Sequence, residues 1–496
     1  MIICILSLVW ADENWSDASL RDQNQYARSV SLDLRGRVPT KEEMLEIEAS
    51  GGLSDQMLDV WLESEDFEEQ VVSYHRSLFW NKLSTQVVTR RRLGRSNNIY
   101  YMPANRNRYR GNTITCGDFE AEFDEEGLLV PQVQEDGTLQ EGWVYVNPYW
   151  DPENPIKMCA FGAQDTEYSA SGVACNTLDG HAELDCGCGP GLQWCYSNPL
   201  RADFTDSVVQ ELDHRVRKML REDLPYDEFL VQPFAQVNGP MVHYFKYIYP
   251  FDTSISPYNA VDELPDLDYT EKDTWVTISL DESAQGVFTS AAWLLRHQTN
   301  RGRANRFYGG FLCKEFIPVG GEIEGLSGTE LPSPDLSRRQ GCVDCHARLE
   351  PMAAYWARWG EASQQYIDPE LFPSYVEDCA TCMTLGTCSS YCRNNYVVEA
   401  THPDENPYLG WLKSYAFLRD VERSNADIGP SLWVHDAAED GDLASCAAHN
   451  ASEWLLGWSE QGDVRDSYAN AFIETGLSFR ELVRAIVRSD AYGRNQ

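Results

Sequence analysis

Apolar residues recur at helical spacing in the first part of the chain. A turn at 36–39 precedes a helix in which Thr40 and Glu43 have the three-residue spacing of a capping box. Ser54 begins a second predicted helix, and a third covers about 66–84. The expected apolar faces are Met44 and Ile47 in the first helix, Met57, Leu58, Val60, Trp61 and Leu62 in the second, and Val71, Val72, Leu78, Phe79 and Trp80 in the third. These patterns predict an N-terminal helical domain over 12–84.

Residues 85–200 lose the helical pattern. Glycine, asparagine, aspartate, tyrosine and proline accumulate there, and 143–146 has the aromatic and β-branched content of a short strand. A segment of this kind buries little apolar surface and needs covalent cross-links. We therefore expect 85–200 to be a disulfide-rich irregular or β insertion in the helical body.

Helical spacing returns after residue 200. The apolar positions Val208, Leu212, Val216, Met219 and Leu220 predict one helix, and 224–230 opens another that Gly239 and Pro240 end. A loop over 250–273, a strand at 275–278, helices at 290–295 and 305–316, and a linker over 318–334 follow. The pattern divides this part into a helical domain over 201–330 and a C-terminal domain over 331–496, which ends in an amphipathic helix at 479–487. The predicted fold class is mainly α.

The most specific motif is Cys342-Val343-Asp344-Cys345-His346, a C-x-x-C-H sequence that occurs once. It has the spacing of a haem c attachment site, because two thiols this close can add to the two vinyl groups of one porphyrin. His346 would then bind the iron from the proximal side. Two other interpretations stay open: a disulfide or half of a zinc site followed by histidine, and a redox dithiol, which needs a βαβ context. A helix with Ala353, Ala354, Trp356 and Trp359 as apolar positions should follow the motif.

The ligand on the opposite side of the iron is not evident from spacing. Met352 comes six residues after His346, which is close for a side chain that must reach the other face. Met383, His402 and His435 are later candidates. With a second ligand the iron would be six-coordinate and suited to electron transfer, whereas an open iron could bind small molecules or react with peroxide.

The cysteine count indicates an exported protein. Residues 1–11 form a short apolar run that ends in Val9-x-Ala11, the pattern of a signal-peptide remnant, and this run contains Cys4. Without Cys4, Cys342 and Cys345, twelve of the fifteen cysteines remain, six within 116–195 and six within 313–446. Twelve thiols in an oxidising compartment predict six disulfides.

Two cysteine clusters allow a second interpretation. Cys379, Cys382, Cys388 and Cys392 could hold zinc or an iron–sulfur cluster, and Cys186 and Cys188 could form a metal site with His181 and Asp185. Export favours disulfides in both places. We expect a periplasmic, extracellular or cell-surface location.

The net charge of the chain limits the classes of molecule that it could bind. The formal net charge is −38 and the sequence pI is about 4.5, which argues against nucleic acids and anionic membranes, because both attract basic surfaces. A basic redox protein is the partner that this charge would attract. Beyond the first residues, no stretch approaches the ~20 apolar residues of a transmembrane helix.

Several motifs along the chain match a known pattern. They are 32–40 (LDLRGRVPT), 224–230 with 237–240 (LPYDEFL and VNGP), 286–289 (GVFT), 303–313, the C-x-x-C-H motif with Glu350-Pro351, and 482–492. On these motifs the chain resembles the large cytochrome c-associated proteins of planctomycetes and myxobacteria, which are built from domains of unknown function. The likeness skips 85–200 and departs at 349–353, where that family often has MDPLGF. It implies an exported haem-carrying protein and supplies no substrate.

Taken together, these features predict an exported protein with one covalent haem c that transfers electrons, in which Cys342, Cys345 and His346 bind the haem and Met383, Met352 or His402 is the second iron ligand. One alternative is a non-catalytic surface or scaffold protein with a structural haem or a disulfide core. Another is a peroxidase-like enzyme with an open iron. A secreted hydrolase lacks support, because the chain contains neither G-x-S-x-G nor H-E-x-x-H.

Overall fold

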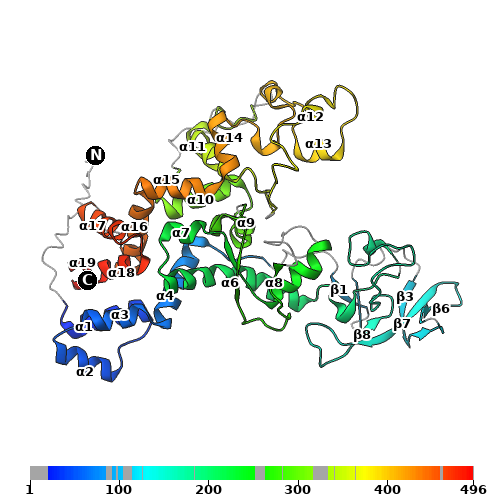
Figure 1. Ribbon diagram of the computed structural model, residues 1–496, viewed down its shortest axis with the longest axis horizontal. Helices are drawn as coiled ribbons and strands as arrows, with labels where there is room; N and C mark the ends of the chain where they lie inside the picture. The colour runs from blue at the N-terminus through cyan, green and yellow to red at the C-terminus, as the bar shows by residue number, and fades with distance from the viewer. Residues whose placement is uncertain are drawn as a thin grey trace, which may run out of the picture. The chain divides into compact units, whose positions relative to one another are not determined.

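The computed structural model describes residues 21–84, 92–96, 99–103, 114–125, 127–183, 185–251, 263–281, 283–316, 333–339, 341–362, 365–458 and 462–494. About half of the chain is helical and a small mixed sheet is present, which confirms the mainly α class (Figure 1). The signal-peptide remnant at 1–11 and nearly all of the linker predicted at 318–334 lie outside the described residues. None of the helices in the described ranges is long and apolar enough to cross a membrane.

The chain forms two compact units that are discontinuous in sequence. The first unit comprises 1–75, 217–226 and 441–496, and the second comprises 76–216 and 227–440. The helices of the first unit include α1 (Gln23–Arg35), α2 (Lys41–Ser50), α3 (Asp55–Leu62), α16 (Asp442–Leu456), α17 (Asp463–Glu474), α18 (Phe479–Val487) and α19 (Asp490–Gly493). Helices α4 (Glu65–Phe79), α6 (Asn198–Glu222) and α7 (Tyr226–Val231) contain residues of both units.

Local sequence signals fix the helix ends of the first unit. The Thr40 hydroxyl accepts a hydrogen bond from the Glu43 backbone N–H, and the Glu43 carboxylate accepts one from the Thr40 N–H, so the predicted capping box is present. Ser54 caps α3 as predicted. In α18, Phe479, Leu482, Val483, Ile486 and Val487 are buried. The predicted amphipathic tail helix is therefore a core element of this unit.

His75 is part of this core. Its ring is fully buried against Tyr74, Tyr226 and Phe479, and burial lowers its pKa to about 4. Its Nδ1 lies 2.9 Å from the Val71 carbonyl oxygen, one helical turn away. A neutral, packed imidazole of this kind has a structural role.

The second unit contains all the described strands. They are β1 (Leu93–Ser96), β2 (Tyr100–Pro103), β3 (Ile114–Glu120), β4 (Glu122–Phe123), β5 (Leu129–Val130), β6 (Gln132–Val133), β7 (Leu139–Val146), β8 (Ile156–Cys159), β9 (Phe234–Val237) and β10 (Val276–Ser279). The main sheet has the order β1-β2-β8-β7-β3, with β6 also paired to β7. Its β7 contains the strand predicted at 143–146, and β10 matches the strand predicted at 275–278.

One helix of the second unit, α11 (Val343–Ala353), carries the C-x-x-C-H motif, and the helices that lie wholly in this unit are the following. They are α8 (Gly239–His243), α9 (Ala291–Arg296), α10 (Asn300–Phe311), α11 (Val343–Ala353), α12 (Glu377–Thr381), α13 (Ser390–Asn395), α14 (Asp420–Ile428) and α15 (Pro430–Glu439). Short 3-10 or π turns are η3 (Gly180–Ala182), η4 (Pro190–Leu192), η5 (Tyr244–Ile248), η6 (Tyr249–Phe251), η8 (Gly286–Thr289), η9 (Ala354–Trp356), η10 (Pro403–Tyr408) and η11 (Lys413–Tyr415).

An aromatic cluster holds the chain just after α11. The Trp356 indole N–H donates to the Phe288 carbonyl oxygen at 2.9 Å, and the ring of Phe307 packs between Phe288 and Trp433. These four side chains are buried and come from η9, η8, α10 and α15. Aromatic pairs of this kind add to the free energy gained by burial alone. They anchor the C-terminal end of α11 in the core of the unit.

Some sequence-based expectations were wrong in detail. Helical spacing predicts that Val60 and Trp80 belong to apolar faces, but they are 65% and 53% exposed. Gly239 and Pro240 start α8 instead of ending a helix, because Asn238 caps that helix and proline suits its first turn. Helix α10 begins at Asn300 rather than 305, since Thr299 is its N-cap, and Cys313 lies beyond its end.

Gly286 generates a stability prediction. Its φ is +63°, and an added Cβ would lie 2.2 Å from the Leu230 carbonyl oxygen. We expect Gly286→Ala to lower the free energy of unfolding by about 1–3 kcal/mol for the backbone conformation alone, with a further loss from the clash. Urea unfolding followed by tryptophan fluorescence would measure this.

Gly309 supplies the matched control. It lies in α10 with helical geometry, and its added Cβ would meet nothing closer than 3.9 Å. Gly309→Ala should raise stability by about 0.5–1 kcal/mol. Equal effects of the two substitutions would contradict the argument from φ.

Candidate functional site

Helix α11 displays the C-x-x-C-H motif on its first turn. Cys342 is the N-cap residue, and the His346 backbone N–H donates to the Cys342 carbonyl oxygen at 3.0 Å. Cys342 and Cys345 are free thiols and half-buried. Residues three apart on a helix share a face, so the two sulfur atoms are presented on one side of the turn.

The His346 ring contacts a carboxylate on the same helix. His346 Nδ1 lies in hydrogen-bonding contact with Glu350 Oε1, one helical turn further on. An ionised carboxylate only accepts hydrogen bonds, so Nδ1 must carry the proton and donate it. Side chains that bind metals through one imidazole nitrogen commonly place the other in this contact. The arrangement leaves Nε2 as the nitrogen available to a metal.

Arg301 holds Glu350 from a second helix. The Arg301 Nε donates to Glu350 Oε1 at 2.7 Å, and this hydrogen bond raises the pKa of Arg301. The side chains of His346 and Glu350 are 21% and 23% exposed, whereas that of Arg301 is 47% exposed. The three residues form a chain of contacts from the C-x-x-C-H motif to the first turn of α10.

The first turn of α10 is itself fixed to the segment after α11. The buried Arg303 donates to the carbonyl oxygens of Trp359 at 3.3 Å and Gly360 at 2.8 Å. The Asn300 backbone N–H donates to the Glu361 carboxylate at 2.9 Å. Because a buried donor left unpaired is costly, these contacts resist sliding of α10 against α11. They explain why Arg301 meets Glu350.

A cavity opens beside the same residues. It has a volume of about 830 Å³ and is lined by Arg301, Glu350, Ala353 and Trp359, and by residues of the segment 393–418. A second cavity of about 280 Å³ shares Arg301 and Glu350 with the first and is also lined by Ala347. The larger cavity is within the range of about 300–1,000 Å³ that is typical of binding sites for cofactors and small molecules, and the smaller one lies just below it. Among the described residues that line either cavity, there is neither a methionine nor a histidine.

The candidates for the opposite iron ligand lie in different settings. Met352 belongs to α11, about 9 Å along the helix axis from His346, so both side chains project from one helix. Met383 is 42% exposed within the loop that the Cys382–Cys388 disulfide closes. His435 is on the exposed side of α15.

His402 lies near the rim of the larger cavity. Its neighbours Thr401 and Glu405 line that cavity. The His402 Nδ1 accepts the Asp404 backbone N–H at 3.2 Å, as the cap of η10. An imidazole that accepts at Nδ1 carries its proton on Nε2, so this hydrogen bond would have to break before Nε2 could bind iron.

The remaining described cysteines are paired. The disulfides are Cys116–Cys159, Cys175–Cys186, Cys188–Cys195, Cys379–Cys392 and Cys382–Cys388, and Cys313 and Cys446 are also disulfide-bonded. This confirms the expected pairing of twelve thiols, including the four at 379–392. Cys342 and Cys345 are the only free thiols among the fourteen described cysteines.

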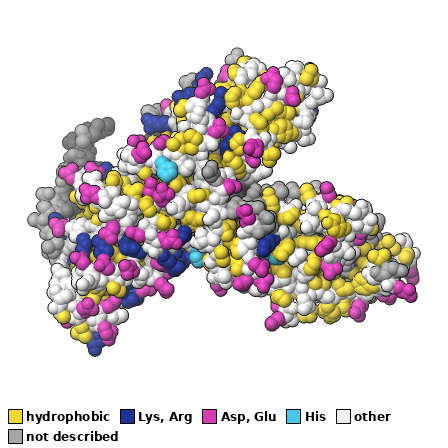
Figure 2. All heavy atoms as spheres, viewed as in Figure 1, with side chains coloured by type: hydrophobic (Ala, Val, Ile, Leu, Met, Phe, Trp, Pro, Cys, Tyr) yellow, Lys and Arg dark blue, Asp and Glu magenta, His cyan; other side chains and the backbone are white. Residues whose placement is uncertain are grey.

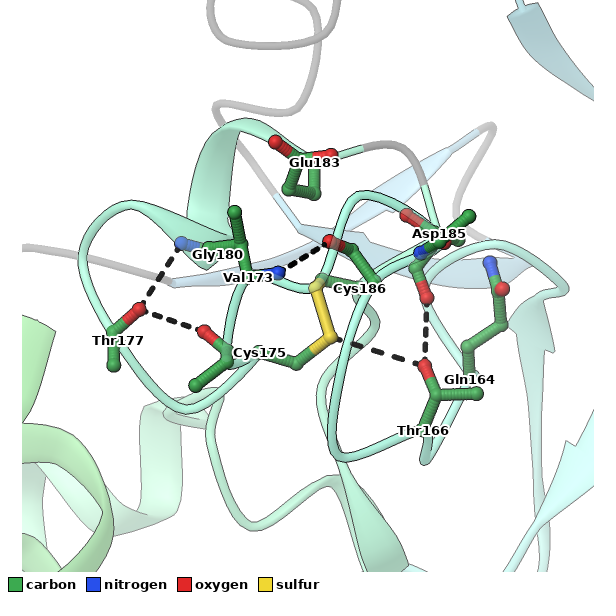
Figure 3. Close-up of a disulfide and its surroundings, with 12 residues drawn as sticks. Gln164, Thr166, Val173, Cys175, Thr177, Gly180, Glu183, Asp185 and Cys186 are labelled. Atoms are coloured by element: carbon green, nitrogen blue, oxygen red, sulfur yellow. Dashed lines mark hydrogen bonds between the residues drawn. A yellow bond between two sulfur atoms is a disulfide. The ribbon is translucent and has the colours of Figure 1, made fainter.

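Figure 3 shows how one of these bridges is embedded. The Thr166 hydroxyl lies 3.8 Å from Cys175 Sγ and donates to the Asp185 carbonyl oxygen at 2.8 Å. Cys186 is bonded to Cys175 and Cys188 to Cys195, so neither is a free ligand for the alternative metal site with His181 and Asp185. Within the described ranges, no group of three or more histidine, cysteine, aspartate or glutamate side chains is arranged to hold a metal ion.

Sequence reasoning assigned no role to Glu350 or Arg301. The spacing of Glu350 could have revealed its contact, because residues four apart on a helix are neighbours and the motif was expected to lead into a helix. Arg301 is 49 residues before Glu350, and no local pattern connects them.

Comparison of the chain with protein-family models, with curated proteins and with solved structures finds no match. The chemistry of the site must therefore be argued from the contacts of Cys342, Cys345, His346, Glu350 and Arg301.

Proposed function

We propose that this is an exported protein that carries one covalent haem c on Cys342 and Cys345, with His346 as proximal ligand, and that it transfers single electrons. The observation that carries the proposal is the state of the cysteines. Twelve of the fourteen described cysteines are disulfide-bonded, and the two that are not belong to the C-x-x-C-H motif. The resemblance to cytochrome c-associated proteins supports the same function.

The disulfides indicate the compartment in which the protein folds. Disulfides persist in oxidising compartments, which suits a periplasmic or extracellular protein. In such a compartment, two neighbouring free thiols would exchange with the other twelve cysteines unless they were chemically blocked. Thioether bonds to one porphyrin would consume both thiols, at the spacing that attachment requires.

The residues around the motif fit a haem. The Glu350 carboxylate holds the proton of His346 on Nδ1, which leaves Nε2 for the iron. The larger cavity is lined in part by the apolar side chains of Trp359, Phe417 and Leu418, which would exclude water, although none of Cys342, Cys345 and His346 is among the described residues that line it. It also has cationic side chains, including Arg393 and Lys413, that could pair with the porphyrin carboxylates.

A bound haem would supply a centre that gains and loses one electron without a change in covalent bonding. The protein would set its potential through the axial ligands, the hydrogen bonds to them and the exclusion of water. No further catalytic residue is required for this function.

The charge of the protein bears on its partner. Figure 2 shows aspartate and glutamate side chains spread over the visible face rather than gathered in one patch. With a formal net charge of −38, the whole field would attract a basic redox protein and speed its approach. We propose such a protein as the partner.

The attachment predicts a specific pattern of thiol reactivity. Protein made in a host that attaches haem c should be reduced, alkylated and digested for mass spectrometry. We expect the twelve disulfide cysteines to be alkylated, while Cys342 and Cys345 stay blocked on a peptide that carries haem, because reduction does not cleave thioethers. Alkylation of both residues after reduction would favour the disulfide or dithiol interpretation.

Loss of one thioether should weaken haem retention. Denatured wild-type protein should keep haem-dependent peroxidase staining on a gel, and Cys345→Ser should lose most of it. The control is the double variant Cys382→Ser, Cys388→Ser, which removes a disulfide in the same unit and should keep the stain. Unstained wild-type protein would overturn the proposed haem.

Electron transfer should depend on the charge of the acceptor. The reduced protein should pass electrons to hexaammineruthenium(III) more slowly as salt rises from about 0.01 M to 0.1 M, because the screening length falls from ~30 Å to ~10 Å. Ferricyanide, an anionic acceptor, should show the opposite trend. Stopped-flow absorbance measures both rates.

The same preparation distinguishes the alternatives. A low-spin spectrum would agree with a six-coordinate electron carrier. Rapid binding of carbon monoxide by the reduced protein would instead indicate the peroxidase-like open iron. A low-spin spectrum without salt-dependent exchange would favour the scaffold protein with a structural haem.

A further inference from the structure

The contact between His346 and Glu350 has a consequence beyond haem attachment. An anionic acceptor on Nδ1–H pulls the proton toward itself and makes Nε2 a stronger electron donor. A stronger axial donor stabilises the oxidised iron relative to the reduced iron, because the oxidised iron carries one more positive charge. A hydrogen bond to a neutral carbonyl oxygen would have a smaller effect, since hydrogen bonds to charged groups are the stronger ones.

We propose that Glu350, held in place by Arg301, is a positioning residue that fixes His346 and lowers the reduction potential of the iron. This inference rests on the proposed function, since it requires a haem on His346. No covalent step is involved: one electron enters the oxidised iron from an external reductant and leaves to an external oxidant, and the proton stays on Nδ1.

The geometry explains why Glu350 is effective in this role. His346 and Glu350 are on one continuous helix, so their contact does not depend on a loop. Both side chains are more than three-quarters shielded, and an electrostatic interaction shielded from solvent is less screened. The carboxylate therefore acts on His346 at short range and in a poorly screened place.

Arg301 limits the freedom of the carboxylate. It donates to the same oxygen, Oε1, that contacts His346, so this oxygen is shared between the two residues. Arg301 is in turn placed by the contacts of Asn300 and Arg303 with the segment 359–361. This support keeps Glu350 from turning toward solvent, where its effect on His346 would be lost.

The test is the reduction potential of haem-loaded variants, measured by spectroelectrochemical titration. Glu350→Gln should raise the potential, with about a tenfold change in the reduction equilibrium constant, which is about 59 mV for one electron. Glu350→Asp keeps the charge but shortens the side chain, so it should also raise the potential. Electron paramagnetic resonance g values of the oxidised iron, which depend on the donor strength of the axial ligands, should shift in both variants.

Asp344→Asn is the charge-matched control. Asp344 is exposed, lies on α11 between the two cysteines, and loses the same charge on substitution. Its potential should move much less than that of Glu350→Gln, and its g values should stay at the wild-type values. If Glu350→Gln does not fold, Glu350→Asp carries the comparison.

The outcomes separate the two proposals. Haem content from the pyridine haemochrome spectrum shows whether wild-type protein is loaded, and a protein without haem would overturn the proposed function and this inference with it. A loaded protein in which Glu350→Gln and Asp344→Asn shift the potential equally would overturn only the role of Glu350. A potential in Glu350→Asp equal to that of wild type would show that charge, and not contact with His346, matters, and would also overturn it.

Discussion

Covalent cross-links replace apolar packing where this chain has little of it. Three small apolar clusters in the second unit contain disulfide cysteines among their buried members: Cys188 and Cys195 in one, Cys175 and Cys186 in another, and Cys379, Cys382 and Cys392 in the third. In these clusters the disulfide sulfur atoms both cross-link the chain and form part of the buried apolar core. A native disulfide in a small secreted domain contributes about 2–5 kcal/mol, so these segments depend on oxidative folding.

The need for oxidative folding also affects the two cysteines of the C-x-x-C-H motif. A chain that must oxidise twelve cysteines exposes Cys342 and Cys345 to the same oxidant and to exchange with the other thiols. The structure keeps them within one turn of α11, whose far end is anchored by the hydrogen bond from Trp356 to Phe288 and by the ring of Trp433. Anchoring α11 in the core restricts the partners that the two thiols can reach. A rigid helix is also suited to present two sulfur atoms and an imidazole to one planar cofactor.

Sequence patterns located the elements that depend on neighbouring residues. The capping box of α2, the buried face of α18 and the strand β7 all follow from spacings of a few residues. Exposure was predicted less well, because a helical pattern does not show which neighbours exist: Val60 fits an apolar face in spacing but is exposed. The pairing of twelve cysteines followed from counting and compartment, whereas the partner of each cysteine is a property of the fold.

Local sequence patterns also could not predict which distant segments belong to the same compact unit. Residues 1–75 and 441–496 belong to one compact unit, although more than 360 residues separate them in the chain. Tyr26 donates a hydrogen bond to the Val487 carbonyl oxygen at 2.7 Å, and Arg488 pairs with Asp55 at 2.6 Å. Neither contact can be predicted from the sequence around either residue.

The candidate site contains residues that local spacing predicts and one residue whose contact only the tertiary fold provides. Cys342, Cys345, His346 and Glu350 follow the spacing of one helix, so a helix over 343–353 already places them on adjacent turns. The contact of Arg301 with Glu350 depends instead on how the chain folds. Without Arg301, the Glu350 carboxylate would contact only the His346 imidazole, and solvent would compete for its oxygens. With it, one carboxylate oxygen, Oε1, contacts both the Arg301 cation and the His346 ring. The hydrogen bond to Glu350 raises the pKa of Arg301, so Arg301 remains a cation, and the oxygen that accepts its hydrogen bond also accepts the one from His346 Nδ1.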